Sequence, residues 1–163
     1  RTSGTEFSEI NVNRIIQDTL ALLEHQFKTA KIRVQPELTS DLPFIYGNAG
    51  KLQQVFLNLF LNAKDAMPQG GSLRVVTTNG TGVNVTISDT GAGIAQEHIQ
   101  RIYDPFFTTK NSPRDGRRGT GLGLSVTYGI IQEHAGKIYV ESEPGRGTTF
   151  YLEFPLLRKA VNV

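Results

Sequence analysis

The stretch Gly119-Thr120-Gly121-Leu122-Gly123-Leu124-Ser125 places three glycines at alternate positions directly before an apolar helical pattern. Val126, Ile130 and Ile131 follow at helical spacing, so a glycine-rich turn is predicted to open a helix here. Such a turn leaves backbone N–H groups unpaired, and the helix dipole favours negative charge at the same place. The stretch therefore predicts a site for phosphate groups at the start of this helix.

A second glycine-rich turn lies earlier in the chain, at Asp89-Thr90-Gly91-Ala92-Gly93. Asp89 continues the apolar face of a predicted strand, because residues 83, 85, 87 and 89 point to one side of it. A carboxylate there needs a hydrogen-bond donor, and the exocyclic amine of adenine would supply one. Two other interpretations remain open, an aspartate that only starts a turn and the Asp-Thr-Gly turn of retroviral-type aspartic proteases. That protease fold is nearly all β, which the long helices predicted below contradict.

The composition is that of an ordinary globular domain, with 38% hydrophobic and 20% charged residues. The length fits one domain spanning residues 1–163, in which residues 1–6 are expected to be disordered or a linker remnant. A net charge of +2 is too small to indicate a nucleic-acid partner. The sequence has no apolar run long enough for a transmembrane helix and no cysteine. We therefore expect a cytoplasmic domain without direct membrane contact, whether or not its parent protein is membrane-anchored.

Three long helices and about six strands are predicted, in mixed order. The helices run from Asn11 or Asn13 to Phe27, over 49–67 and over 122–134, with a short one over 96–102. The strands cover 32–34, ended by Pro36, and 42–46, 73–78, 83–88, 137–142 and 148–154. The last four form two hairpins. This mixture predicts an α/β two-layer sandwich, with a mixed sheet of about five or more strands covered on one face by three helices.

The helix over residues 49–67 carries two amides, Asn58 and Asn62, beside an otherwise apolar stripe. They are four residues apart and so lie on one face. Burying each without a partner would cost about 1–3 kcal/mol, so both must be exposed or hydrogen-bonded. In one interpretation they bond nearby backbone. In the other, a side-chain oxygen ligates Mg²⁺ that carries nucleotide phosphates, since this ion prefers hard oxygen ligands.

Asp104-Pro105-Phe106-Phe107-Thr108-Thr109-Lys110 runs into a basic, glycine-containing segment over residues 108–118, which lies between the two phenylalanines and Gly119. In the simplest interpretation this segment is a solvated loop without a function of its own. It could also fold over a polyphosphate, with Lys110 as the contact. Gly119–Gly123 matches neither the dinucleotide fingerprint nor the P-loop, so the phosphates need a different loop architecture.

Taken in order, Asn58-x-x-x-Asn62-Ala63, Asp89-x-Gly91-x-Gly93, Asp104–Lys110 and Gly119–Leu124 resemble the N, G1, F and G2 boxes of bacterial sensor histidine kinases. The resemblance spans about residues 7–155 and continues into Gly145-Arg146-Gly147-Thr148-Thr149-Phe150. The family shares an ATP-binding fold, the Bergerat type, with type II topoisomerases, mismatch-repair ATPases and heat-shock chaperones. The resemblance implies a helix-over-sheet sandwich with ATP between helices and a mobile lid over residues 108–118.

The resemblance also implies the site. Asn62 would ligate Mg²⁺, Asn58 would support the phosphates, and Asp89 would bind the adenine amino group. Gly91 and Gly93 would permit the close turn beside the base, and Thr148 would assist near Asp89 through a hydroxyl or a water. Lys110 and the G2 backbone would hold the β- and γ-phosphates, with Asn58 and Lys110 taking part in catalysis. The full set of implied nucleotide contacts is Asn58, Asn62, Asp65, Asp89, Gly91, Gly93, Ile94, Lys110, Gly119, Thr120, Gly121, Leu122, Gly123, Leu124 and Thr148.

The chain departs from the family pattern at two places. Many sensor kinases carry Lys or Arg where Asp65 stands, and the form Asn-Ala-x-Asp-Ala-Met looks like the nitrogen-regulatory branch. The phosphoacceptor box is missing, because His25, His98 and His134 lack an acidic neighbour on the C-terminal side and look like surface or helix-end histidines. The resemblance then implies that the γ-phosphoryl group goes to a histidine on a separate dimerisation domain, and from there to a response-regulator receiver domain.

Two alternatives stay open. A stand-alone relative could be an anti-sigma-type serine kinase or an ATPase. ATPase members of the superfamily carry a water-activating Glu where Asn58 stands, and the Phe-Phe-Thr-Thr-Lys box argues against the serine kinase. The other alternative is a degenerate domain that only binds a partner protein. Since Asn58 cannot act as a general base, the sequence predicts Mg·ATP binding with negligible hydrolysis or autophosphorylation by this chain alone.

Overall fold

The computed structural model describes residues 6–99, 102 and 120–156. Its helices are α1 Val12–Leu22, α2 Glu24–Thr29, α3 Ala49–Asp65, α4 Gln96–Ile99 and α5 Thr120–Glu133. Its strands are β1 Ser8–Ile10, β2 Ile32–Leu38, β3 Ile45–Gly47, β4 Gly71–Asn79, β5 Gly82–Asp89, β6 Lys137–Glu143 and β7 Gly147–Pro155. The predicted lid over 108–118, with Lys110, and Gly119 lie outside the described residues.

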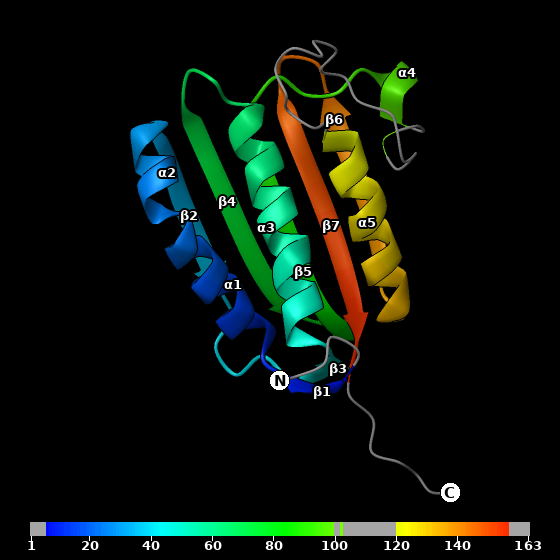
Figure 1. The fold of residues 1–163 in the computed structure, drawn as a ribbon. Helices are drawn as coiled ribbons and strands as arrows, with labels where there is room; N and C mark the ends of the chain where they lie inside the picture. The colour runs from blue at the N-terminus through cyan, green and yellow to red at the C-terminus, as the bar shows by residue number, and fades with distance from the viewer. Residues whose placement is uncertain (1–5, 100–101, 103–119, 157–163) are drawn as a thin grey trace, which may run out of the picture.

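Five strands form one mixed sheet in the order β2-β4-β5-β7-β6 (Figure 1). β2 and β4 are parallel, and the three other pairs are antiparallel. Both predicted hairpins, β4–β5 and β6–β7, are present. β1 and β3 pair in a separate two-stranded sheet, which the sequence analysis did not foresee. The prediction of a mixed sheet with about five or more strands is therefore confirmed.

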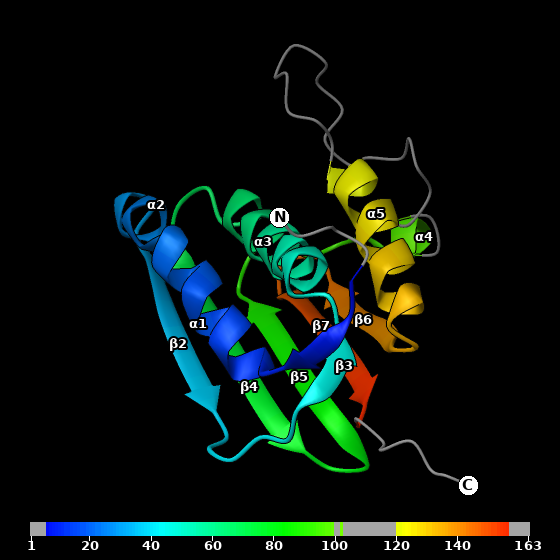
Figure 2. The ribbon, with the colours of Figure 1, turned by 60° about the horizontal axis from the view of Figure 1, so that its bottom comes forward.

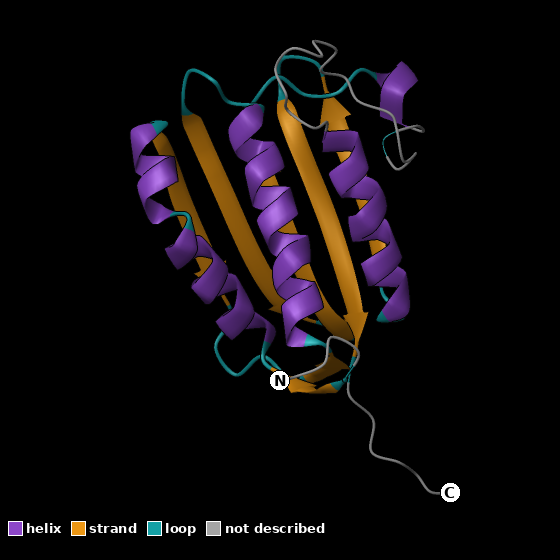
Figure 3. Ribbon diagram, viewed as in Figure 1, coloured by secondary structure: helices purple, strands orange, loops and turns teal. Residues whose placement is uncertain are grey.

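The helices form a single layer on one face of this sheet. Figure 2 shows α1, α3 and α5 side by side above the strands, and Figure 3 shows the purple helix layer in front of the orange sheet. The predicted two-layer α/β sandwich is therefore confirmed, with α1 and α2 together taking the place of the first predicted helix. None of the described helices is both long and apolar enough to cross a membrane.

The start of α1 agrees with one of the two predicted N-caps, whereas the end of the first helix and the end of β2 differ from the predictions. Asn11 caps α1, since its side chain accepts from the backbone N–H of Arg14 at 3.3 Å. The chain leaves helical geometry at Leu23, and this break lets both Leu23 and Phe27 pack in the core. Pro36 does not end β2. Among the described strands β2 lies at the edge of the sheet and pairs with β4 alone, and proline is tolerated in an edge strand.

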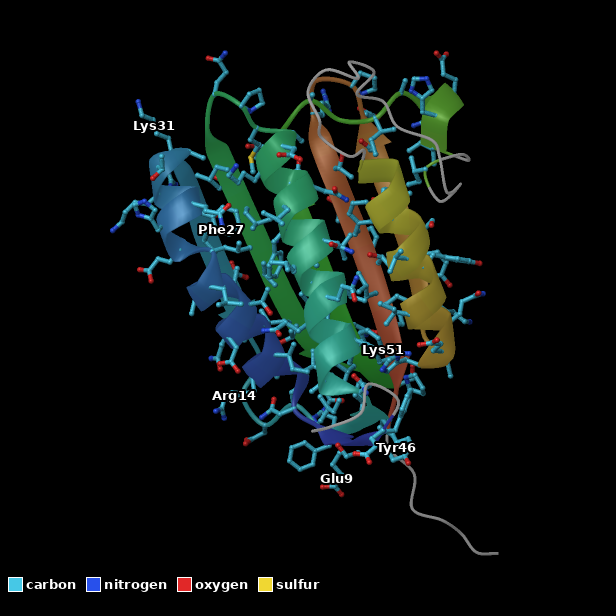
Figure 4. All side chains as sticks on the ribbon, viewed as in Figure 1. Glu9, Arg14, Phe27, Lys31, Tyr46 and Lys51 are labelled. Atoms are coloured by element: carbon cyan, nitrogen blue, oxygen red, sulfur yellow. The ribbon has the colours of Figure 1, made fainter. Side chains whose placement is uncertain are left out.

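The hydrophobic core lies between the helix layer and the sheet. Figure 4 shows Phe27 pointing from α2 toward the sheet. The opposite face of the sheet is polar, as its cross-strand ion pair between Arg74 and Glu37 shows at 2.8 Å. The largest fully buried core side chains include Phe27, Phe56, Phe60, Phe154, Ile16, Leu52, Leu59, Leu73, Ile87 and Ile131. This one-sided burial fixes the strand register, because a slip of one residue would turn the polar face inward.

His134 joins three segments at the end of the molecule where β1 and β3 lie. It follows α5, as predicted for a helix-end histidine, but it is buried rather than on the surface. Its Nε2 accepts from the backbone N–H of Asn48 at 3.0 Å, so Nδ1, 2.8 Å from the carbonyl of Ile130, carries the proton. The ring of Phe7 stacks on the imidazole at 4.8 Å. Gly47 makes room, since a Cβ there would lie 2.6 Å from the ring.

Asn48 extends this junction in both directions. Its Oδ1 caps α3 by accepting from the backbone N–H of Lys51 at 2.8 Å, and its Nδ2 donates to the carbonyl of Glu6 at 2.9 Å. Lys51 pairs with Glu133 at 2.9 Å, joining α3 to α5 a second time. Glu6, at the end of the segment expected to be disordered, is thus held by the start of α3.

The His134 junction predicts that stability falls when the pH drops below the usual histidine range. Burial lowers the pKa of His134 from its ordinary 6.5, Lys51 lowers it further, and the Ile130 carbonyl and Glu133 oppose this. The unfolded chain therefore binds this proton more readily than the folded chain, so stability is full at higher pH and decreases as pH falls through 6.5. Urea unfolding followed by circular dichroism between pH 7.5 and 5.5 should show this decrease.

His134→Gln keeps an acceptor for the Asn48 N–H but cannot titrate, so its unfolding free energy should lose this pH dependence. His25→Gln, at a solvent-exposed histidine, is the matched control and should retain it. A pH dependence that is the same in all three proteins would contradict the role given to His134.

Candidate functional site

Asp89 is the last residue of β5, directly opposite Thr148 at the start of β7. Its Oδ1 accepts from the backbone N–H of Gly91 at 2.8 Å and of Thr148 at 3.3 Å. Burial raises the pKa of Asp89 above its ordinary value, and the N–H groups of Gly91 and Thr148 oppose that rise. Within the part of the chain that the structure describes, Oδ2 receives no hydrogen bond. This carboxylate is therefore half-satisfied and calls for a further donor.

The loop after β5 is pressed against α3 on one side and the β6–β7 turn on the other. The N–H of Ala92 donates to the carbonyl of Ala66, just beyond α3, at 3.0 Å, and Gly145 donates to the carbonyl of Ala92 at 2.7 Å. A Cβ on Gly91 would collide with the Ala66 carbonyl, and one on Gly93, where φ is +79°, with the carbonyl of Glu143. Both glycines thus permit close backbone contacts between the loop and these two neighbouring segments.

A buried hydroxyl, that of Ser142 on β6, completes this network. Its Oγ accepts from the backbone N–H of Ile94 at 2.7 Å, lies 2.8 Å from the Thr148 hydroxyl and donates to the carbonyl of Gly147 at 3.0 Å. The side chain of Gln96 donates to the Ser142 carbonyl at 3.0 Å. The sequence analysis missed Ser142 and Gln96. Alternation along the predicted hairpin could have found Ser142, because it puts Ser142 opposite Thr148 on the inner face.

Asn58, Asn62 and Asp65 lie on α3, and all three are half-buried. Spacings of four and three residues place them along one side of the helix, which leads toward Ala66 and the loop after β5. Asn58 Nδ2 donates to the buried hydroxyl of Thr127 on α5 at 3.5 Å, a long bond that leaves the amide oxygen turned elsewhere. Asn62 makes no side-chain hydrogen bond to any described residue, so its oxygen is available to a ligand.

The start of α5 lies near these residues and forms a further part of the candidate site. The helix begins at Thr120, two residues before the predicted start, so its first turn comprises residues 120–123, including Gly121, Leu122 and Gly123. The first four N–H groups of a helix have no partner within it. Leu124, next along the chain, is buried in the core and anchors this end of α5. The amino end of α5, the carboxyl end of α3 and the β6–β7 turn lie at the same end of the molecule (Figure 1).

Residues 47–158, more than two thirds of the chain, match the model of the family described as histidine kinase-, DNA gyrase B- and HSP90-like ATPases. The chain belongs to this family. Within it, the similar proteins are sensor histidine kinases, and the chain corresponds to their catalytic ATP-binding domain. Sporulation kinase E of Bacillus subtilis is 39% identical over 156 residues, which cover 94% of this chain and 20% of that protein. Sensor histidine kinase ZraS of Escherichia coli is 36% identical over 148 residues, covering 90% and 30%.

Solved structures of this family share the fold. The nucleotide-free catalytic domain of histidine kinase ThkA superimposes with a TM-score of 0.81 at 32% identity, covering 94% of this chain and 99% of that one. ThkA in complex with response regulator protein TrrA gives 0.75 at 29% identity, covering 91% and 41%. The chain spans less than a third of each curated kinase named here, whereas it matches nearly the whole of the isolated ThkA domain. The predicted family and Bergerat-type fold are confirmed.

The close approach at Gly93 gives a prediction with an internal control. Gly93 and Gly145 both have positive φ, +79° and +82°, but a Cβ at Gly145 meets no atom within 4 Å. Gly145→Ala should therefore cost only the backbone strain of about 1–2 kcal/mol. Gly93→Ala should cost about 1–3 kcal/mol more, because the added methyl displaces the Glu143 carbonyl. Urea unfolding of both variants measures the difference, and equal losses would contradict the close-packing account.

Proposed function

We propose that this chain binds Mg·ATP between α3, α5 and the end of the sheet and supplies its γ-phosphoryl group to a histidine. That histidine lies on a separate dimerisation domain, as in the sensor histidine kinases that this chain resembles. The observation that carries the proposal is the half-satisfied carboxylate of Asp89, half-buried at the end of β5 before the loop that contacts Ala66 and Gly145.

Recognition of the base rests on Asp89. Its Oδ1 is held by two backbone N–H groups, which orients Oδ2 for a donor such as the adenine amino group. The raised pKa of Asp89 reflects what it costs to keep this group ionised, and a hydrogen-bond donor from the ligand would offset that cost. Ile94 and Thr148 flank it through the Ser142 network.

The phosphates and the metal ion belong at the helices. The amide oxygens of Asn62 and Asn58 fit the hard-oxygen preference of Mg²⁺, with Asn62 as the ligand and Asn58 in support of the phosphates. The first turn of α5, residues 120–123, offers backbone N–H groups at a helix amino end, which favour anions. Lys110, Gly119 and the lid over 108–118 complete this part of the proposal, and Asp65 stands where many of these kinases have a cation.

The residues of the proposed site suit phosphoryl transfer better than hydrolysis. In the transfer, the bond from γ-phosphorus to the bridging oxygen breaks to release ADP, and an imidazole nitrogen forms the new bond to phosphorus. An imidazole is itself a good nucleophile, so this chain needs only to position ATP and neutralise charge. Asn58 stands where a water-activating carboxylate would be needed, and an amide cannot take a proton from water. This favours a kinase over a self-contained ATPase.

The partners follow from the same proposal. The phosphoryl group would pass from this domain to the dimerisation domain of the parent kinase, and then to a receiver domain. The structure of ThkA with response regulator protein TrrA supports the second step by resemblance. The alternative of a partner-binding domain without nucleotide is less favoured, since Asp89 and both α3 amides are in place.

Calorimetric titration with the non-hydrolysable analogue AMPPNP, with and without Mg²⁺, tests the proposed site. We expect saturable, Mg²⁺-dependent binding, and Asp89→Asn should weaken it about 10- to 100-fold through loss of a charged acceptor. Glu37→Gln, the same carboxylate-to-amide change at an exposed ion pair, is the matched control and should bind normally. Absence of binding by the unmodified chain would refute the proposal.

Phosphate release tests the assignment to transfer rather than hydrolysis. With Mg·ATP, this chain alone should release phosphate at a rate close to that of the protein-free blank, because the amides of Asn58 and Asn62 cannot take a proton from water and Asp89 is assigned to the base. With an added phosphoacceptor histidine domain, radiolabel from the γ-position should appear on that domain. Sustained release by the chain alone would favour the ATPase alternative.

A further inference from the structure

The buried hydroxyl of Ser142 has three hydrogen-bond contacts, and it can donate its single proton in only one of them. Ser142 is 8% exposed and Thr148 is 6% exposed, so neither hydroxyl can rely on solvent. Ser142 Oγ lies within hydrogen-bond distance of the Ile94 N–H, the Gly147 carbonyl and the Thr148 hydroxyl. A serine hydroxyl has one proton to donate and two lone pairs to accept with.

Only one assignment of protons satisfies all three contacts. The Ile94 N–H can only donate, so it takes one lone pair of Ser142. The Gly147 carbonyl can only accept, so it takes the proton of Ser142. The remaining contact then requires Thr148 to donate its own proton to the second lone pair of Ser142, at 2.8 Å. In this arrangement the Thr148 oxygen can no longer donate to any other group, and only its lone pairs remain.

Thr148 is the direct neighbour of Asp89 across the β5–β7 pair, and its backbone N–H donates to Asp89 Oδ1. Oδ2 of Asp89 and Oγ of Thr148 are therefore both acceptors on the same inner edge of the site. An amino group of a ligand can donate hydrogen bonds to these two oxygens. A carbonyl oxygen cannot, because both oxygens offer it only lone pairs.

We propose that Ser142 is a positioning residue for nucleotide specificity: it fixes the Thr148 hydroxyl as an acceptor and so makes the site select 6-aminopurine over 6-oxopurine nucleotides. This inference rests on the proposed function, because it places the purine ring at Asp89. Ser142 acts entirely through Thr148 and the loop at Ile94 and does not itself meet the base.

Competition between Mg·ATP and Mg·ITP tests this directly, since ITP differs from ATP in carrying a carbonyl at C6 and a proton on N1. The unmodified chain should prefer ATP by about 10- to 100-fold, the cost of leaving buried acceptors unpaired. In Ser142→Ala the Thr148 hydroxyl can rotate and donate to a carbonyl, so the ATP-to-ITP preference should fall about 3- to 10-fold. Thr148→Val removes the Thr148 hydroxyl while Ser142 stays in place, and it should reduce the ATP-to-ITP preference by a similar factor.

The controls separate selectivity from general damage. Ser88→Ala removes a hydroxyl that pairs with Thr149 at 2.9 Å on the other face of the same sheet, and should leave the preference unchanged. Ser142→Thr keeps a hydroxyl and should retain the preference. Because Ser142→Ala also leaves the Ile94 N–H unpaired, both nucleotides can bind more weakly, but that effect cancels in the ratio.

Three outcomes are distinguishable. A reduced ATP-to-ITP ratio in Ser142→Ala and Thr148→Val, with Ser88→Ala unchanged, supports the proposal. Equal weakening of both nucleotides, with the ratio preserved, overturns it and leaves Ser142 a purely structural residue. Failure of the unmodified chain to bind either nucleotide overturns the proposed function, and this inference with it.

Discussion

The candidate site depends on the close approach of three backbone segments around one half-buried carboxylate, that of Asp89. The loop after β5 touches the end of α3 through Ala66 and the β6–β7 turn through Glu143 and Gly145. Neither approach leaves room for a Cβ at Gly91 or Gly93. Asp89, at the start of this loop, is thereby partly shielded from water while only one of its oxygens is paired within the described residues. The fold thus keeps a polar group in an unfavourable state, which a ligand with the right donor can relieve.

The opposite end of the molecule is held by a different interaction, centred on His134. Here the segment before α1, the start of α3 and the end of α5 meet at one imidazole, whose two nitrogens have fixed and opposite roles. The two helices that carry the phosphate part of the proposed site are thus tied to each other at the end remote from it, also through Lys51 and Glu133.

Much of the fold could be predicted from the sequence, because strand alternation, helical spacing and glycine turns are local signals. The two hairpins and the helix over residues 49–67 follow from such signals. The continuation of β2 past Pro36 could not, since proline is excluded from central strands and only the tertiary arrangement shows that β2 is at an edge. The pairing of β1 with β3 and the burial of His134 also depend on contacts between residues far apart in the chain.

The same distinction holds at the site. Asn58, Asn62 and Asp89 were identifiable because an amide or carboxylate interrupts an apolar pattern. Ser142 interrupts no such pattern: alternation along the hairpin places it on the inner face, but only the structure gives its contacts. Its importance comes from counting protons among Ile94, Gly147 and Thr148, which requires the register of the β6–β7 hairpin.

The division of the site between two kinds of element suits transfer to an external nucleophile. The proposed base pocket is built from strand ends and a tight loop, where backbone hydrogen bonds fix each group and a small difference in ligand chemistry can be detected. The proposed phosphate part lies between α3 and α5, joined beside Asn58 by the long bond to Thr127. A γ-phosphoryl group must remain reachable by an imidazole from another domain, so this part cannot be enclosed by the sheet. Recognition of the base therefore needs an enclosed site, whereas transfer of the phosphoryl group needs an accessible one. Placing the base at the strand ends and the phosphates between the helices meets both needs.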